Sequence, residues 1–420
     1  MTSNLLTSKK WANTNILKPL AMFSIALYLT LMTVFESQSS SLSRLASLGL
    51  YVCLGFCGLY ILSRKRIKLP WIIIALAVFG VLLSISVLYT KTGASTVNTY
   101  IYRFWTSFVL IFVIANVPDS YEDIDFLIKV LILSGAVLAL YLYFFYGWDY
   151  LISAEERLDH TFGNQNSTAV RCAFSTIFAV YKIATQKNRM RFLWLIPGIV
   201  CVPAVMFLAS RKAILMIGVG LFTLFFVYSK NRNLVKKIVL IALVLVLLWY
   251  VIQFVPAFSI IKDRFDEMFA LFEGNRSDIN EGDVNRMRYI EMSLAAFLES
   301  PLFGKGFYYS QYLFGTYSHN NFLELLMNNG IIGFAAYYFT YVKLFLDARK
   351  LKRIAPAAHA LVLTTVMTMV ALDVGVVSYF NRYTLILLTL CCVTFFVRHK
   401  QDPLPSEQPT PYKEEKDHKE

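Results

Sequence analysis

A histidine lies at the head of a strongly apolar stretch, inside the polar cluster Ser-His-Asn-Asn at 318–321. The apolar stretch then runs on to Gly330 and Gly333. At the water boundary of a membrane segment, the imidazole of His319 can exchange protons near neutral pH, as removal of a proton from a sugar hydroxyl requires. The alternative interpretation is a polar helix cap followed by two glycines that permit close packing. Under the first interpretation, Asn320 contributes to substrate binding.

Three arginines have the chemistry to accompany this histidine. Arg211 lies in a tight turn between two apolar blocks, and Arg286 and Arg288 begin a helical stretch that ends before a Pro-Leu-Phe-Gly turn at 301–304. A guanidinium can donate two parallel hydrogen bonds to phosphate oxygens, and it stays charged at every accessible pH. The alternative for each arginine is a side chain that reaches for lipid headgroups.

A second polar patch occupies the loop 147–166. Arg157 and His160 precede a Gly-Asn-Gln-Asn run in which Asn164 and Asn166 can hydrogen-bond sugar hydroxyls. His160 is the rival candidate for a catalytic base and ranks below His319. A solvated turn is an equally good interpretation of this patch.

Two carboxylates complete the candidate site. Asp373 lies within an apolar block, where an ionisable side chain indicates function by default. Glu324 follows His319 by about one helical turn. Asp373 is expected to pair with an arginine or to orient the histidine, and Glu324 is expected to orient the histidine. We assign both to substrate binding around His319.

Several catalytic motifs are missing from the sequence. There is no phosphate-cradling Gly-Lys-Thr loop, no His-Glu pair with zinc spacing, no Gly-x-Ser-x-Gly turn and no aspartate pair suited to a divalent ion. The sequence therefore predicts neither a metal nor another cofactor.

The composition indicates an all-α polytopic membrane protein. The 420 residues are 57% hydrophobic and 16% charged, the mean hydropathy is +0.55, and the apolar blocks are long enough to cross a bilayer, which takes about 20 residues. The net charge of +13 lies in short clusters between these blocks, which indicates membrane topology rather than nucleic-acid binding. The six cysteines all fall in apolar blocks and are predicted to be buried thiols without disulfides: Cys53, Cys57, Cys172, Cys201, Cys391 and Cys392.

Twelve transmembrane helices are predicted, beginning with an uncleaved first span. Their expected ranges are 19–36, 44–63, 70–90, 101–117, 124–146, 167–185, 192–209, 213–229, 236–256, 320–342, 357–377 and 383–397. With the N-terminus inside, the basic clusters at 64–68, 187–191, 230–237 and 349–353 all lie in the cytoplasm. The connection at 118–123 is acidic and gives no support to this orientation.

This topology places one sizeable loop outside the membrane, at 257–319. Apolar residues at helical spacing predict a helix on the outer membrane surface over 258–273 and a second helix over 284–299. The resulting organisation has five parts: a cytoplasmic N-terminus at 1–18, spans 1–9 at 19–256, an external catalytic loop at 257–319, spans 10–12 at 320–397, and a disordered cytoplasmic tail at 398–420.

At these residues the chain resembles the O-antigen ligase and Wzy-type polysaccharide polymerase superfamily, over about residues 150–335. His319-Asn320, followed after nine residues by Gly330-x-x-Gly333, is similar to that family's His-Asn motif after its large external loop. Arg286 precedes Pro301 by fifteen residues, as does the family's loop arginine before its Pro-Leu-x-Gly turn.

Two further segments carry the resemblance. The run Ser-Arg-Lys-Ala at 210–213 looks like the family's arginine-bearing turn, and residues 157–166 resemble its Arg-…-Gly-Asn-x-Asn segment. One departure is Ile290, which stands where an aromatic residue is common four residues after the loop arginine. The departure affects packing more than chemistry.

The resemblance implies an inverting, metal-independent glycosyltransferase with the membrane-embedded fold of the C superclass. Such an enzyme resides in the bacterial cytoplasmic membrane and takes an undecaprenyl-diphosphate-linked glycan as donor at the periplasmic or outer face. In this role Arg211 and Arg286 bind the diphosphate and His319 deprotonates or orients the acceptor hydroxyl. The product would be an O-antigen, a capsule or another exopolysaccharide of the cell envelope.

The acceptor separates two activities within the family. A polymerase, which we favour, adds the growing chain to another lipid-linked repeat unit, whereas a ligase transfers it to lipid A–core of lipopolysaccharide or to a protein. The sequence does not decide whether a chain-length regulator binds. From other classes, a glycolipid transporter or flippase would place its ionisable groups near the bilayer midplane, and a scaffold would leave the three candidate residues together by chance.

Overall fold

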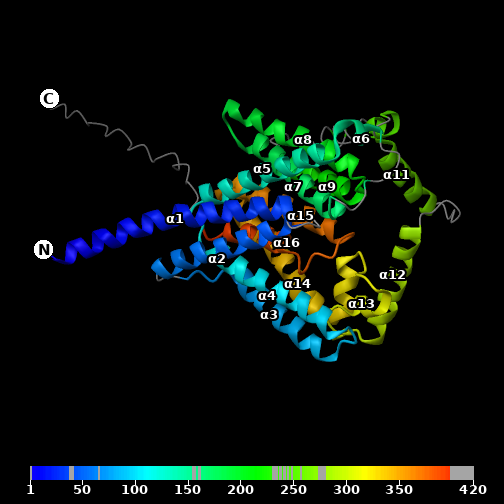
Figure 1. The fold of residues 1–420 in the computed structure, drawn as a ribbon, viewed down its shortest axis with the longest axis horizontal. Helices are drawn as coiled ribbons and strands as arrows, with labels where there is room; N and C mark the ends of the chain where they lie inside the picture. Colours follow the sequence, from blue (N-terminus) through cyan, green and yellow to red (C-terminus); the bar gives the residue numbers. More distant parts are fainter. Residues whose placement is uncertain are drawn as a thin grey trace, which may run out of the picture.

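In its described residues the chain is an all-helical bundle. The computed structural model describes residues 2–36, 42–64, 67–153, 158, 162–228, 249–255, 258–272 and 281–397, together with the single residues 235, 239, 243 and 246. Most of the long helices run along one direction, and α11 and α12 cross the end of the bundle that lies opposite the start of α1 (Figure 1). Every element in these ranges is a helix.

The elements follow one another along the chain as α1 (Thr2–Phe35), α2 (Ser43–Arg64), α3 (Trp71–Ser86), η1 (Val87–Tyr89), α4 (Ala94–Asn116), α5 (Tyr121–Tyr146), α6 (Trp148–Ser153), α7 (Gln165–Thr185), η2 (Arg189–Trp194), α8 (Leu195–Phe207), α9 (Arg211–Tyr228), α11 (Ser259–Phe272), α12 (Glu281–Glu299), α13 (Tyr309–Phe314), α14 (Asn321–Ile354), α15 (Pro356–Asp373) and α16 (Arg382–Val393).

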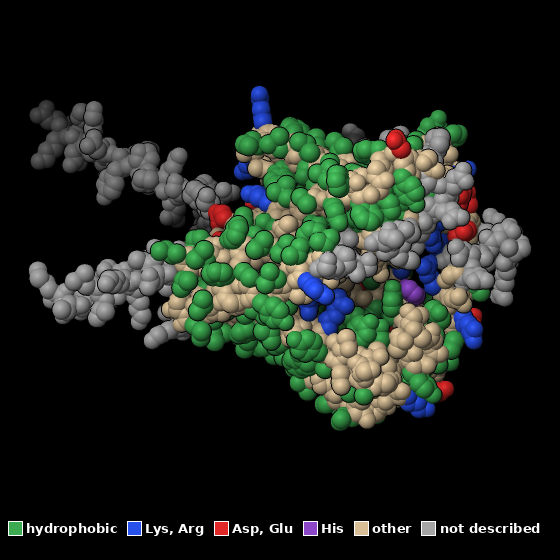
Figure 2. Space-filling view, in the orientation of Figure 1, with side chains coloured by type: hydrophobic (Ala, Val, Ile, Leu, Met, Phe, Trp, Pro, Cys, Tyr) green, Lys and Arg blue, Asp and Glu red, His purple; other side chains and the backbone are tan. Residues whose placement is uncertain are grey.

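The outside of the bundle is apolar, as expected of a polytopic membrane protein. Leu62 in α2, Leu88 in η1 and Phe144 in α5 are 76%, 85% and 87% exposed, and hydrophobic side chains cover much of the face seen in Figure 2. Side chains of this kind would destabilise the folded protein in water and are stabilised by lipid. All six cysteines are buried and free, which confirms that prediction.

Nine helical segments among the described residues are long and apolar enough to cross a membrane: Ile16–Phe35, Ser43–Arg64, Trp71–Tyr89, Ala94–Asn116, Tyr121–Tyr146, Arg189–Phe207, Arg211–Tyr228, Asn321–Ile354 and Pro356–Asp373. Each coincides with an expected span. Of the other three, α7 carries the buried Arg171 and Lys182, α16 has 12 residues, and 236–256 falls largely outside the described residues. The total of twelve stays a prediction.

Helix α14 continues well beyond the end expected at 342. Its last turns are amphipathic, and Asp347 forms ion pairs of 3.0 Å with Lys343 and 2.6 Å with Lys350. Ion pairs at these helical spacings stabilise the added turns. The helix therefore extends to Ile354.

The acidic connection at 118–123 lies against basic residues at the end of the bundle where α1 begins. Asp119 accepts hydrogen bonds from Arg64 at 2.6 Å and Lys68 at 2.8 Å, and Lys18 lies 2.8 Å from Asp123. Partial burial would raise the pKa of Asp119, but the bonds from Lys68 and Arg64 lower it to about 2. The acidic residues therefore neutralise basic side chains at this end.

The opposite end carries the two helices predicted for the loop 257–319. They form α11 and α12, so both helices are confirmed, with each end within three residues of the expected one. In α11, Phe265 and Phe269 pack against Trp249 with ring centroids 6.4 and 5.8 Å apart. The apolar face of this helix thus contacts the bundle, while its position on a membrane surface stays a prediction.

Gly330 marks a break inside α14 rather than a flat surface for helix packing. Its φ and ψ are 62° and −167°, outside the helical region. The turn at 301–304 packs into this break: Ile331 N–H donates to the carbonyl of Pro301 at 2.8 Å, and Lys305 N–H donates to that of Met327 at 2.8 Å. The glycine motif and the Pro-Leu-x-Gly motif are therefore two halves of one structural unit.

Candidate functional site

His319 sits in a tight turn directly before α14. Asn320 is the N-cap of that helix, and its side chain accepts a hydrogen bond of 3.0 Å from Leu323 N–H. His319 has a φ of 61°, a left-handed conformation that is uncommon outside glycine and is tolerated by histidine and asparagine better than by most residues. Backbone strain of this kind concentrates at functional sites, where the surrounding structure enforces it.

Glu324 holds this turn from beneath. The carboxylate is fully buried and accepts hydrogen bonds from Ser310 hydroxyl at 2.6 Å, Ser318 N–H at 2.8 Å and Asn328 amide at 3.0 Å. A buried carboxylate needs such donors to offset its lost hydration. Glu324 thus fixes the residue before His319, and within the described part of the chain its hydrogen bonds go to residues other than His319.

Asp373 belongs to a second buried network at the start of α14. Tyr338 donates to its carboxylate at 2.9 Å, and the Ser378 hydroxyl donates to the other oxygen. Asn321 links the network to the helix, because its amide donates to Tyr338 at 2.9 Å and its oxygen accepts from Ser378 N–H at 2.8 Å. Asp373 thus ties the end of α15 to the middle of α14 and to the segment that follows α15.

The imidazole of His319 lies between aromatic rings and cationic groups. The ring of Tyr317 is 4.2 Å away and that of Tyr289 is 6.4 Å away and nearly parallel. Nδ1 is buried and has no hydrogen-bond partner among the described residues. Burial, followed by the charges of Lys212 and Arg286, lowers the pKa of His319 from 6.5 to about 4. The free enzyme thus holds this imidazole neutral at pH 7.

This lowered pKa predicts the acid limb of the pH–rate profile. If neutral His319 is the base, kcat/KM should stay level from about pH 8 to pH 5 and fall with an apparent pKa near 4. Lys212→Gln removes a charge that disfavours the imidazolium, so its limb should move to higher pH. Lys305→Gln, which breaks the exposed pair with Glu299, serves as the control. A wild-type limb near 6.5 would contradict the assignment.

The same shift affects stability. Between pH 6.5 and about 4 the unfolded chain binds a proton at His319 that the folded chain does not. The free energy of unfolding therefore falls as the pH is lowered through this window. Stability has to be measured alongside the rates.

The turn with Arg211 begins α9 at the same end of the bundle. Arg211 donates a hydrogen bond of 2.7 Å to the carbonyl of Arg264 in α11, and Lys212 donates to the carbonyl of Gly375 after α15. Ser210 hydroxyl lies 3.4 Å from the Asn166 side-chain oxygen. The turn therefore joins α9 to three neighbouring segments, and two cations occupy the first turn of α9.

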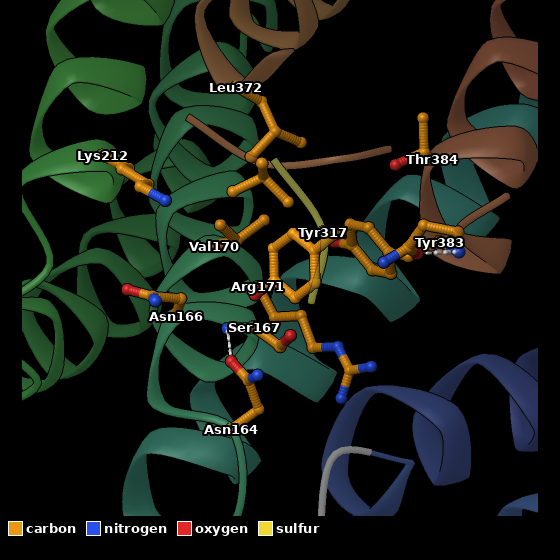
Figure 3. A pocket seen from close by; sticks show the side chains of 12 residues that line it. Asn164, Asn166, Ser167, Val170, Arg171, Lys212, Tyr317, Leu372, Tyr383 and Thr384 are labelled. Carbon is orange, nitrogen blue, oxygen red and sulfur yellow. Dashed lines mark hydrogen bonds between the residues drawn. The ribbon is translucent and has the colours of Figure 1, made fainter. Parts of the chain in front are cut away.

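A pocket adjoins His319 on the side of Tyr317. Its volume is about 530 Å³, including open solvent, and its lining consists of Asn164, Asn166, Ser167, Val170, Arg171, Lys212, Tyr317, Leu372, Val376, Asn381, Tyr383 and Thr384. Figure 3 shows the amine of Lys212 pointing into this space from α9, whereas the side chain of Arg171 extends from α7 towards the N-terminal helices. In Figure 2, a histidine occupies a hollow beside Lys and Arg side chains.

The first turns of three helices converge on this pocket. Asn164 caps α7 by accepting from Ser167 N–H at 3.0 Å, and Asn381 caps α16 by accepting from Tyr383 N–H at 2.9 Å. Lys212 contributes the first turn of α9. Helix N-termini carry partial positive charge, so the pocket favours an anion even before its lysine and arginine are counted.

The structure brings together only part of the predicted site. His319, Arg286 and Lys212 interact through their charges. Arg288 is exposed on α12 and lines a different hollow, beside Tyr289 and Phe314.

The remaining predicted site residues fall into three groups. Asn164 and Asn166 line the pocket, Glu324 and Asp373 lie fully buried beneath the site, and Arg157 and His160 lie outside the described residues.

Three residues at the site were not among the predicted candidates. Lys212 directly follows Arg211, and Tyr317 precedes the polar cluster by one residue. Arg171 lies inside an expected span, where an ionisable side chain was itself a signal of function. Next to Ile290, the ring of Tyr289 stacks on Phe314 with ring centroids 4.4 Å apart.

Fold and site together define a polytopic membrane protein with a cationic site at one end of its helical bundle. Residues 196–338 match the family model of the O-antigen ligases, and this part of the chain holds Arg211, Arg286 and His319. No curated protein sequence matches the chain. This match identifies the protein as a membrane glycosyltransferase, and the matched family acts on lipid-linked glycans.

Proposed function

We propose that the protein polymerises oligosaccharide repeat units carried on undecaprenyl diphosphate. The observation that carries the proposal is a neutral imidazole, His319, that is held between aromatic rings and two cationic side chains beside an anion-favouring pocket. A base and a set of phosphate-binding cations are what transfer from a lipid diphosphate requires.

In the proposed reaction, a hydroxyl of the acceptor glycan attacks the anomeric carbon of the donor. The bond between that carbon and the diphosphate oxygen breaks, and lipid diphosphate leaves with the electron pair. His319 takes the hydroxyl proton, and Arg211 and Arg286 stabilise the charge on the leaving diphosphate. Displacement from the opposite face inverts the anomeric configuration.

Donor binding is expected to activate the base. Lys212 and Arg286 lower the pKa of His319 in the free protein, and a diphosphate bound beside these cations offsets their charge. The imidazolium that forms during attack then costs less free energy. The base is thus strongest when the donor is in place.

The remaining predicted residues take supporting roles in this proposal. In this proposal Asn164, Asn166 and Arg288 contact glycan groups, and Asn320 caps the helix that carries the base. Glu324 and Asp373 position that helix through their buried networks.

We infer that the site faces the periplasm or the outside. The basic residues Lys18, Arg64 and Lys68 lie at the opposite end of the bundle, where Asp119 and Asp123 meet them. Positive residues mark the cytoplasmic ends of spans. This arrangement supports an external site in the cytoplasmic membrane.

The choice of acceptor tests this function against the ligase alternative. Purified protein supplied only with lipid-diphosphate-linked repeat units is expected to produce a ladder of lengthening glycans on a gel. Absence of the ladder, together with transfer when lipid A–core or an acceptor protein is added, would identify a ligase instead. Inactivity with every acceptor would contradict transfer by this protein and favour a glycolipid transporter.

A further inference from the structure

A group of charged residues lies behind the pocket and is not used by the proposed mechanism. Glu36, directly after α1, has guanidinium groups from three helices around its carboxylate. The N···O distances are 3.0 Å to Arg171 of α7, 3.6 Å to Arg382 of α16 and 3.7 Å to Arg103 of α4. We name these four residues the arginine cluster.

The arginine cluster leads from the pocket to the surface of the bundle. The exposed fraction of the side chain rises from 6% for Arg171, which lines the pocket, to 17% for Arg382 and 39% for Arg103. Arg103 lies nine residues into α4, which places its backbone about 14 Å from the start of that helix. Charges at such depth are costly in a membrane protein and mark substrate paths.

Helix stability alone does not account for this arrangement. Arg382 is the first residue of α16, and the helix dipole disfavours a cation at that position. Its guanidinium also donates hydrogen bonds of 3.2 Å to the hydroxyls of Ser107 and Thr106, which hold it against α4. Three guanidinium groups and one carboxylate carry a net positive charge, so an anion complements them.

Two cationic regions therefore flank the reacting position. Arg286 and Lys212 both act on His319, whereas the arginine cluster lies beyond Tyr317, whose ring packs 4.2 Å from that of His319. A single diphosphate does not need both. A reaction between two lipid-linked substrates brings two diphosphates to the site, one that leaves and one that stays on the acceptor.

We propose that Arg103, Arg171 and Arg382 form a second phosphate site, at the Arg171 side of the pocket, that binds the diphosphate of the acceptor, itself a lipid-linked substrate. This inference rests on the proposed polymerase function, because a ligase acceptor need not carry a lipid diphosphate. The exposed end of the cluster at Arg103 gives the acceptor headgroup a route from the side of the bundle.

The test separates the two substrates chemically. The donor carries a methyl group on the hydroxyl that would otherwise accept, so it can only donate. One acceptor has a methylene group in place of the oxygen that joins sugar to diphosphate, so it keeps its charge and can only accept. A second acceptor is the same glycan without lipid or diphosphate.

Arg103→Gln and Arg382→Gln are expected to weaken only the preference for the charged acceptor. The ratio of kcat/KM for the lipid-linked acceptor to that for the free glycan should fall by about tenfold or more in each variant. Arg44→Gln is the matched control, because Arg44 is exposed at the start of α2, at the same end of the bundle, and forms no ion pair among the described residues. Melting curves establish which variants fold. If Arg382→Gln does not fold, Arg103→Gln still tests the proposal, because Arg103 lies at the exposed end of the cluster.

Any one of three kinetic results would contradict the proposal of a second phosphate site. The ratio is unchanged in folded variants, or the KM for the donor rises instead, or the variants differ from wild type only when anionic phospholipid is present. The last result would assign the cluster to bilayer headgroups, and comparison of uncharged detergent with anionic nanodiscs detects it.

Equilibrium binding separates this inference from the proposed function. Without donor, the methylene-linked lipid diphosphate is expected to bind wild type at two equivalents per chain and Arg382→Gln at one. This readout needs no turnover, so it holds even if the wild-type protein forms no ladder. A single equivalent bound by wild type would contradict the second site whatever the acceptor proves to be.

Discussion

Replacement of Arg286 by glutamine is expected to lower kcat by about 10²- to 10³-fold, the usual loss when one charge-stabilising donor is removed from a transition state. Arg286 projects from α12 close enough to His319 and Tyr317 for its charge to act on both. Its interaction with the diphosphate strengthens as the glycosidic bond breaks, so the loss should appear in kcat at saturating donor. Initial rates of transfer measure it directly.

Arg288 provides the comparison on the same helix. It lies two residues further along α12, is exposed, and lines the hollow beside Phe314 rather than the surroundings of His319. Arg288→Gln should therefore cost far less than Arg286→Gln at saturating donor. Equal losses in the two variants, or full activity in folded Arg286→Gln, would show that Arg286 does not stabilise the leaving diphosphate.

Gly330→Ala is expected to destabilise the protein by about 3 kcal/mol or more, through backbone strain and a direct clash. A Cβ at Gly330 would lie 2.3 Å from the carbonyl oxygen of Leu302, and its φ of 62° disfavours any L side chain. The clash involves backbone on both sides, so no side-chain rotation relieves it. The turn at 301–304 would separate from α14, and His319 would lose its position.

Gly218→Ala is the matched control for this prediction. Gly218 lies within the regular helix α9, and a Cβ there meets nothing within 4 Å. The control should keep its melting temperature and transfer rate, whereas Gly330→Ala should lose both. A Gly330→Ala variant that melts and reacts like wild type would mean that the break in α14 does not support the catalytic turn.

Much of the fold follows from local sequence patterns. Continuous apolar blocks identified the segments that match the nine candidate spans, and apolar residues at helical spacing identified α11 and α12. These patterns depend on neighbours three or four residues apart. The extension of α14 to Ile354 was missed because hydropathy falls where Asp347 begins to pair with lysines.

In the candidate site, too, local sequence patterns identify some residues, whereas contacts between distant segments remain unpredicted. His319, Arg211 and Arg286 were identifiable because their residue types and spacing are unusual for a membrane protein. The network of Asp373 with Tyr338 and Ser378, and the bonds of Glu324 to Ser310 and Ser318, arise from contacts between distant segments. No spacing rule predicts such contacts, so the buried networks around these two carboxylates could not be predicted from the sequence.

The arginine cluster could not be predicted from the sequence for the same reason, because it depends on contacts between distant segments. Glu36 and Arg382 are more than 300 residues apart in the sequence, and their proximity depends on how the helices of the bundle pack. Arg171 alone carried a local signal, as a charged residue inside an apolar span. Only the three-dimensional arrangement reveals that three arginines share one carboxylate.

The most direct test of the central claim compares wild type with His319→Asn in the ladder assay with lipid-linked repeat units. Asparagine tolerates the φ of 61° that His319 adopts, so the variant keeps the turn and removes only the base. We expect a ladder from wild type and none from the folded variant. A ladder of equal length and rate from both proteins would contradict the role of His319 and, with it, the proposed mechanism.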